Sequence, residues 1–159
     1  IGSLGNDTIT GGVGDDTIKG SSGNDTIIIS DIENEGIDQL WAFTTDEDGA
    51  GVNKGDDHIQ FSKADLEAVT GFTAAAASTV SKIDIDAGAG EVWVEYITGS
   101  GASVTGSHAT FLFDEDTGTL SFDADGDGAG AAITVAQVYS DDGTTAVDDL
   151  LAPDFAFIA

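Results

Sequence analysis

Apolar residues recur every nine positions at the start of the chain. Ile9, Ile18 and Ile27 each follow a Thr and precede one further residue, and turns rich in Gly, Asn and Asp separate these short segments. Thr and Ile favour extended backbone, whereas Gly permits the positive φ angles of tight turns. The pattern predicts three minimal strands whose isoleucines point inward and stack into a narrow core.

The same period predicts how the strands are arranged. Each nonapeptide forms half a coil, and two nonapeptides complete a turn with one strand on either side. The first loop therefore stacks against the third loop, not the second. We place this parallel β-roll at residues 1–36, because the repeat register fails after Ile28.

Residues 37–159 show ordinary strand alternation with one helical segment. Val92, Val94 and Tyr96 alternate with less apolar neighbours, which is the pattern of a half-buried strand. Ser62 is placed to cap a short helix that carries Asp65 at its third position. We expect this region to form an antiparallel β-sandwich, or a sheet that extends the roll, and to cap the roll's open end. Strands are predicted at residues 37–43, 58–61, 83–85, 91–97, 110–113, 119–122, 132–138 and 155–158. The predicted fold class is all-β with one short helix.

The charge balance changes the picture of possible partners. Thirty acidic residues face four basic ones, which gives a formal net charge of −26. Such a field repels nucleic acid and attracts divalent cations. Cysteine is absent and only two histidines occur, so the chain has no disulfide and no thiolate zinc site. No run of about 18 apolar residues predicts a membrane span.

The polar positions of the repeat carry the candidate chemistry. Gly occupies positions one and four, Asn or Asp position five, and Asp position six in all three copies. Stacking of alternate loops places Asp7 and Asp25 on one edge of the roll, with backbone carbonyl groups aimed between them. Carboxylate and carbonyl oxygens are the ligands that Ca²⁺ prefers. An empty stack of carboxylates would repel itself, so we expect metal binding and folding to be coupled.

These residues carry a resemblance to a known family. The copies beginning at Gly2, Gly11 and Gly20 resemble the RTX (repeats-in-toxin) nonapeptide G-G-x-G-x-D-x-U-x, in which U is a bulky apolar residue. Ser3 and Ser21 stand in place of the second Gly in two copies. The resemblance implies a Ca²⁺-binding β-roll. The candidate metal ligands are Gly2, Leu4, Asn6, Asp7, Gly11, Val13, Asp15, Asp16, Ser21, Gly23, Asp25 and Asp31.

Two further metal positions are less directly indicated. Loop two should face the degenerate segment at residues 29–34, where Asp31 could complete a site with Gly11, Val13 and Asp15. The Asp16 side chain should instead point toward a preceding loop. Farther along, alternate carboxylates followed by Gly resemble the front half of an EF-hand loop, but its closing Glu is missing and strand follows. This second segment is either a Ca²⁺-binding turn or a plain turn between strands. Its carboxylates are Asp123, Asp125 and Asp127.

Parts of residues 36–66, 111–130 and 150–158 resemble sequences that flank RTX repeats. The resemblance implies export by a type I secretion system through an uncleaved C-terminal signal, and a secreted, extracellular or bacterial cell-surface location. The chain begins inside a repeat, which suggests the C-terminal part of a longer protein. Candidate partners are calcium ions, the secretion machinery, other copies of the chain and cell-surface glycan.

Three functions fit this reading. The first is the secretion and calcium-folding tail of a surface-layer or adhesin-type protein. The second is the same tail on a secreted protease or lipase, and the third is a carbohydrate-binding β-sandwich with Trp41 or Trp93 as a stacking platform. We expect no enzyme in this chain, because no G-x-S-x-G or H-E-x-x-H motif occurs. His58, beside Asp56 and Asp57, is expected to be structural.

Overall fold

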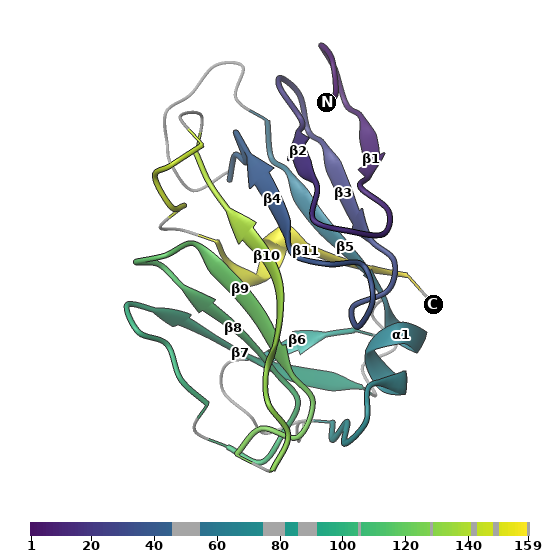
Figure 1. Ribbon diagram of the computed structural model, residues 1–159, viewed down its shortest axis with the longest axis vertical. Coiled ribbons are helices and arrows are strands. Elements are labelled where there is room, and N and C mark those ends of the chain that lie inside the picture. The colour runs from purple at the N-terminus through teal and green to yellow at the C-terminus, as the bar shows by residue number, and fades with distance from the viewer. Residues whose placement is uncertain are drawn as a thin grey trace.

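The computed structural model describes residues 1–45, 55–74, 82–85, 92–104, 106–127, 129–140, 143–147 and 150–158. Its strands form two sheets (Figure 1). The four-stranded sheet contains, in order, β1 (Thr8–Thr10), β3 (Thr26–Ile29), β5 (His58–Ser62) and β11 (Phe155–Ile158). The seven-stranded sheet contains, in order, β2 (Thr17–Lys19), β4 (Asp38–Trp41), β10 (Ile133–Val138), β9 (Thr119–Asp123), β8 (Thr110–Asp114), β7 (Trp93–Gly99) and β6 (Lys82–Asp84).

Alternate repeats enter alternate sheets. The strands of repeats one and three pair in parallel, with Ile9 opposite Ile27, while the strand of repeat two lies in the other sheet. Since the side-chain period of a strand is two, this register keeps the central isoleucine of each repeat facing the space between the sheets. The half-coil prediction for the repeats is confirmed in this arrangement.

The coil continues beyond the recognisable repeats. β4 pairs in parallel with β2, placing Leu40 opposite Ile18, and β5 pairs in parallel with β3, placing Ile59 opposite Ile27. Both sheets therefore run without interruption across residue 36, where the sequence predicts the end of the roll.

The remaining strands give an all-β fold, as predicted, but the sheet is mixed. β8 and β9 form the expected antiparallel hairpin, and β10 and β6 also have antiparallel neighbours. The β7–β8 and β4–β10 pairs are parallel, so the expectation of an antiparallel sandwich is wrong in this detail. Through the β4–β10 pair, the second half of the chain extends the roll.

One short α-helix follows β5, as predicted. α1 (Lys63–Ala68) begins after Ser62, whose side chain accepts a hydrogen bond from the Asp65 N–H, and Leu66 is its buried residue. A 3₁₀ turn, η2 (Ala152–Asp154), precedes β11. Within the described part of the chain, no helix is long and apolar enough to cross a membrane.

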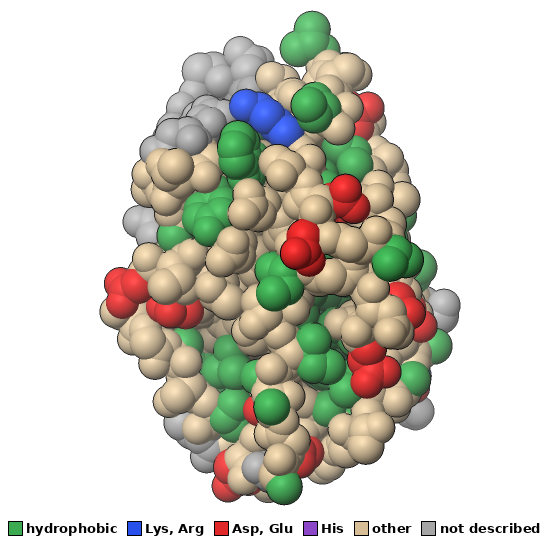
Figure 2. Space-filling model, viewed as in Figure 1, with side chains coloured by type: hydrophobic (Ala, Val, Ile, Leu, Met, Phe, Trp, Pro, Cys, Tyr) green, Lys and Arg blue, Asp and Glu red, His purple; other side chains and the backbone are tan. Residues whose placement is uncertain are grey.

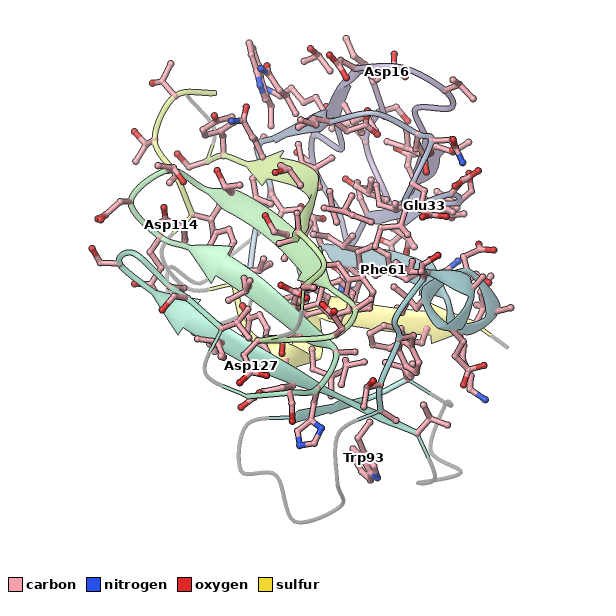
Figure 3. All side chains as sticks on the ribbon, turned by 60° about the horizontal axis from the view of Figure 1, so that its bottom comes forward. Asp16, Glu33, Phe61, Trp93, Asp114 and Asp127 are labelled. Atoms are coloured by element: carbon pink, nitrogen blue, oxygen red, sulfur yellow. The ribbon has the colours of Figure 1, made fainter. Side chains whose placement is uncertain are left out.

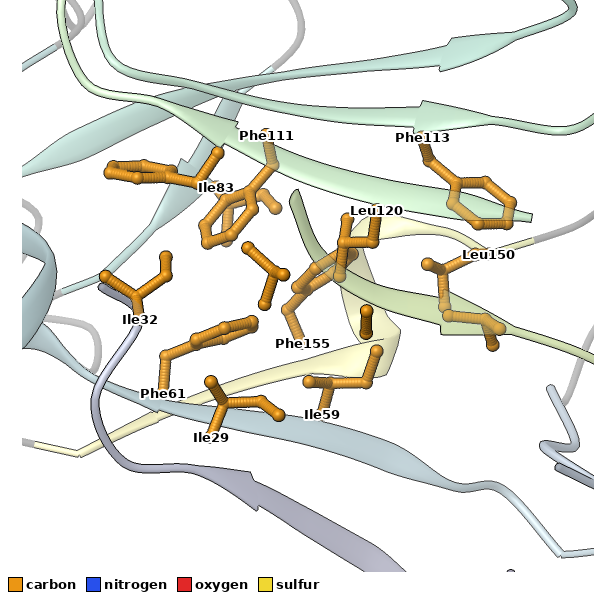
Figure 4. Packing of buried hydrophobic residues seen from close by; sticks show 14 of the residues in the cluster. Ile29, Ile32, Ile59, Phe61, Ile83, Phe111, Phe113, Leu120, Leu150 and Phe155 are labelled. Atoms are coloured by element: carbon orange, nitrogen blue, oxygen red, sulfur yellow. The ribbon is translucent and has the colours of Figure 1, made fainter. Parts of the chain in front are cut away.

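The core lies between the two sheets and changes character along the molecule. Near the repeats it consists of stacked isoleucines, whereas farther on it contains a group of aromatic rings (Figure 4). The Phe111 ring centroid lies 5.0 Å from that of Phe61 and 4.9 Å from that of Phe122. Full burial of one such side chain contributes about 1.5–3 kcal/mol, so the aromatic group supplies much of the apolar stabilisation.

Candidate metal centre

The aspartates at position six of the repeat form a ladder along one edge of the roll. The Asp7 N–H donates to Oδ1 of Asp25 at 2.8 Å, and the Asp25 N–H donates to Oδ1 of Asp57 at 2.8 Å. Each rung thus presents its carboxylate to the backbone of the rung before it. The repeat requires Asp here because a short side chain with two acceptor oxygens can hold the neighbouring loop and keep one oxygen available.

Asp25 is the central rung of this ladder. Its side chain is fully buried, and its Oδ2 atom has no hydrogen-bond donor among the residues that the structure describes. A buried carboxylate oxygen without a donor or counter-ion is strongly unfavourable. The described part of the chain leaves this oxygen unsatisfied, which is the condition that a bound cation would relieve.

The glycines at position one keep the space beside these carboxylates open. A Cβ atom on Gly20 would collide with Oδ2 of Asp25. A Cβ atom on Gly2 would collide with the carbonyl oxygen of Gly20 and would lie 2.8 Å from Oδ2 of Asp7. Carboxylate and carbonyl oxygens therefore border the volume that a side chain at position one would fill. Such an oxygen-lined cradle suits a hard cation such as Ca²⁺.

The ladder ends at Asp57, where the protein satisfies both oxygens. Oδ1 accepts the Asp25 N–H, while Oδ2 accepts the Thr44 N–H at 2.9 Å and the Thr44 hydroxyl at 3.0 Å. Burial raises the pKa of Asp57 above its ordinary value, and the nearby Asp25 carboxylate adds to this rise, while the donated hydrogen bonds oppose it. Asp57 therefore closes the stack with protein donors and has no oxygen left over for a metal.

A second ladder runs along the opposite edge of the roll. The Asp16 N–H donates to Oδ1 of Asp38 at 3.0 Å. Asp38 is fully buried, and its Oδ2 finds no donor in the described residues. Burial raises the pKa of Asp38, and the carboxylates of Glu35, Asp16 and Asp15 raise it further, against the hydrogen bond from Asp16.

The structure corrects two expectations about loop two. Asp31 lies in a separate exposed turn, where its carboxylate accepts hydrogen bonds from the Glu33 and Asn34 N–H groups and from the Asn34 side chain. The residue that faces loop two is Asp38, so the register predicted for the fourth half-turn is wrong. Asp16 also faces this following half-turn instead of a preceding loop.

Other predicted ligands hold the loops together. Oδ1 of Asn6 accepts the Asn24 N–H at 3.0 Å, and Oδ1 of Asp15 accepts the Ile37 N–H at 2.9 Å. Gly23 packs against the carbonyl group of Gly5 in the first repeat. Ser21 has a φ of 89°, close to the φ of 90° that Gly12 adopts at the same repeat position. The side chains of Leu4 and Val13 are exposed, so only their backbone groups could serve as ligands.

The three carboxylates near residue 125 do not converge. Oδ1 of Asp123 accepts the Asp125 N–H, Oδ2 of Asp125 accepts the Gly130 N–H, and Asp127 is exposed. Figure 3 shows Asp127 well apart from Asp16 in the roll. Across the described residues, no three His, Asp or Glu side chains gather as a metal-binding group. The roll instead brings carboxylates from stacked half-turns together along each edge, with the Gly20 carbonyl beside Asp7 on the first edge.

Sequence reasoning missed Asp38 and Asp57 as ladder positions, although a signal was present. Gly36-x-Asp38-x-Leu40 and Gly55-x-Asp57-x-Ile59 repeat the Gly, Asp and apolar residues at positions four, six and eight. A search that allowed insertions between half-turns would have found both.

Comparison with known proteins supports the assignment of the repeats. The family model of the RTX calcium-binding nonapeptide repeat (4 copies) matches residues 1–28 of the 159-residue chain. No curated protein matches the chain, and neither does any solved structure. The repeats are thus of the calcium-binding RTX type, and the match ends before Asp38 and Asp57.

Proposed function

We propose that this chain is an extracellular calcium-binding module whose roll folds when Ca²⁺ binds after secretion. The observation that carries the proposal is Oδ2 of Asp25, which is fully buried, has no donor in the described part of the chain and borders an oxygen-lined space. Asp7 and Asp25 would hold the ion through their carboxylates, and Gly20 through its carbonyl. The bound ion supplies positive charge between stacked carboxylates.

Calcium fits this site better than softer metals. The described donors around it are carboxylate and carbonyl oxygens, and the chain lacks Cys and Met. Ca²⁺ takes 6–8 oxygen ligands in flexible geometry, whereas Mg²⁺ requires a small octahedral cage and retains water. Successive loops of peptide carbonyls with few carboxylates therefore favour Ca²⁺ over Mg²⁺.

A folding switch follows from the energetics of the roll. At a free concentration about ten times Kd, one bound ion stabilises the folded state by about 1.4 kcal/mol. Extracellular Ca²⁺ modules commonly have Kd values of about 10⁻⁴–10⁻³ M, so the low free Ca²⁺ of a cytosol would leave the sites empty. Acidic side chains greatly outnumber basic ones on the face in Figure 2, and their repulsion opposes folding until cations bind.

The wider role that we favour is the tail of a large surface-layer or adhesin-type protein exported by type I secretion. The RTX repeats support the export route, and the lack of sequence motifs for catalysis supports a role without chemistry in this chain. The matching alternative is the tail of a secreted protease or lipase. The Nε2 atom of His58 lies 3.9 Å from Oδ2 of Asp56, and both side chains are partly exposed. This pair does not orient a nucleophile.

Glycan binding, with Trp41 or Trp93 as a stacking platform, is a second candidate function. Gly143 packs closely against the Trp41 ring, since a Cβ there would lie 2.7 Å from Trp41 Cδ2. One side of this ring is therefore covered by protein. Titration with oligosaccharides while recording Trp fluorescence tests the idea, and an unchanged spectrum would argue against it.

The main test is far-UV circular dichroism of the chain in chelator, followed by separate titrations with Ca²⁺ and Mg²⁺. We expect a cooperative gain of β signal near millimolar Ca²⁺ and little change with Mg²⁺. A spectrum that is already fully β in chelator and does not respond to Ca²⁺ would show that the repeats are metal-free structural turns.

A further inference from the structure

We infer that a second Ca²⁺ site lies on the other edge of the roll, between loop two and the half-turn at residues 36–38, with the carboxylates of Asp16 and Asp38 as ligands. This inference rests on the proposed function, because it assumes that the roll binds calcium. It extends that function to a half-turn beyond the matched repeats. In this inference Asp38, not Asp31, is the partner of loop two.

The geometry around Gly11 carries the inference. A Cβ atom on Gly11 would lie 2.9 Å from Oδ2 of Asp16 and 2.9 Å from Oδ2 of Asp38. Two carboxylate oxygens from different half-turns thus converge on one point that only Gly leaves open. Two negative charges at one site repel each other, and a cation or a proton between them would relieve this repulsion.

Asp38 provides an independent observation. Its side chain is fully buried, its Oδ1 is held by the Asp16 N–H, and no described donor reaches its Oδ2. On the first edge, the equivalent terminal residue Asp57 has both oxygens satisfied, because Thr44 supplies two donors. Nothing in the described chain supplies such a donor to Asp38, so its ladder ends in an open oxygen.

The site has solvent access. A groove of about 500 Å³ runs beside it over the outer face of the seven-stranded sheet. Asp15 and Asp16 line one part of this groove, and Gln39 and Gln137 line another. An ion can therefore reach Asp16 from solvent, and water in the groove can complete its coordination.

A metal ion here would join the two parts of the molecule. Asp38 is the first residue of β4, which pairs with β2 of the roll on one side and with β10 on the other. Ala136 of β10 lies opposite Asp38 itself. Ion binding would therefore fix the strand through which the roll joins the seven-stranded sheet.

The test counts bound ions on the full chain by native mass spectrometry and calorimetry at saturating Ca²⁺. Asp38→Asn keeps an oxygen for the Asp16 N–H but removes the open carboxylate oxygen, so it should bind one ion fewer than wild type. Asp31→Asn makes the same charge change in an exposed turn and should bind the wild-type number. Asp16→Asn should repeat the loss seen with Asp38→Asn, and its folding is protected because its ladder bond comes from the backbone.

Terbium luminescence locates the lost ion. Trp41 lies three residues after Asp38 on β4, about 10 Å away along the strand, whereas Trp93 lies four strands away in the sheet order, at about 19 Å. Tb³⁺ emission excited through Trp should fall strongly in Trp41→Phe and in Asp38→Asn, but not in Asp31→Asn.

The outcomes separate the two proposals. Full stoichiometry in Asp38→Asn and Asp16→Asn, or equal loss in Asp31→Asn, would overturn this site while leaving the Asp7–Asp25 site standing. Absence of Ca²⁺ binding by the wild-type chain would overturn both.

Discussion

The roll and the aromatic half of this protein are stabilised in different ways. The roll has a narrow core of aliphatic side chains, leaves Ile9 partly exposed, and buries Oδ2 of Asp25 and Oδ2 of Asp38 at its edges without a described donor. The aromatic half buries several Phe rings in mutual contact, including Phe111 and Phe122 at essentially no exposure. Under the proposed function, the first region depends on a bound cation, whereas the second depends on apolar burial.

This difference in stabilisation indicates which region calcium binding could control. If the proposed function holds, the narrow aliphatic core contributes too little to offset charge repulsion, and the roll's stability follows the free Ca²⁺ concentration. We expect no such dependence in the aromatic core. The sheets join the two regions, because β2 and β3 of the roll continue into β4 and β5.

The largest effect should come from truncation in the aromatic core. Phe111→Ala removes a ring that contacts Phe61, Phe122 and Phe155, and such a change costs about 3–5 kcal/mol. Urea unfolding at several Ca²⁺ concentrations should give the same loss at each, because the ring touches no metal ligand. A loss that grew with Ca²⁺ would contradict the separation of the two regions.

A smaller effect with the opposite calcium dependence is expected in the roll. Asp25→Asn removes a buried charge, so it should leave the metal-free protein as stable as wild type or more stable. At Ca²⁺ about ten times Kd it should lose about 1.4 kcal/mol, the stabilisation from one ion. Asp127→Asn makes the same charge change at an exposed position and should show neither effect; equal behaviour of the two variants would mean that general acidity governs folding.

The sequence was sufficient to predict the roll, the pairing of alternate repeats and the position of Asp25 on the edge that it shares with Asp7. These follow from local rules, since the spacing of Gly, Asp and Ile fixes which groups share an edge. The positions of Asp38 and Asp57 could not be read by counting nines, because they follow the preceding ladder positions by 13 and 19 residues. Insertions in surface loops cost little free energy, so the register of the strands survives while the period in sequence is lost.

The sequence pattern also did not predict which strands pair with each other in the second half of the chain. Alternation predicts which face of a strand is buried, but it contains no information on which strand lies beside it. The parallel pairs β4–β10 and β7–β8 join segments far apart or separated by long connections. Their discovery required the three-dimensional arrangement.

A smaller loss of stability is expected at Asp57, where the first ladder ends. Thr44→Val keeps the shape of the side chain and removes the hydroxyl that donates to Asp57, and loss of one such hydrogen bond costs about 0.5–1.5 kcal/mol. The loss should be the same with and without Ca²⁺, because Asp57 has no free oxygen for a metal. A change in calorimetric Ca²⁺ affinity would instead identify Asp57 as a ligand.

The smallest effect concerns pH and the metal-free protein. Burial raises the pKa of Asp38, Asp57 and Asp123 above the ordinary value of 3.8. In the window above 3.8 the folded state then binds more protons than the unfolded state, so stability is highest at the acidic end and falls as pH rises through the raised pKa values. Asp114 acts in the opposite sense, since hydrogen bonds from Gly101, Thr117 and Asp116 lower its pKa, but its contribution is lost only below 3.8.

Circular dichroism in chelator should therefore show β signal increasing as pH falls from 7 toward 4, by the equivalent of about 1 kcal/mol or less. With saturating Ca²⁺ the trend should reverse, because protons compete with the metal for the same carboxylate oxygens. Asp38→Asn should weaken the trend in chelator, whereas Asp127→Asn should leave it intact. The contrary result is a metal-free protein that loses structure steadily between pH 7 and 4. That result would mean that protein donors already stabilise its buried carboxylates, so that the roll needs no cation to fold.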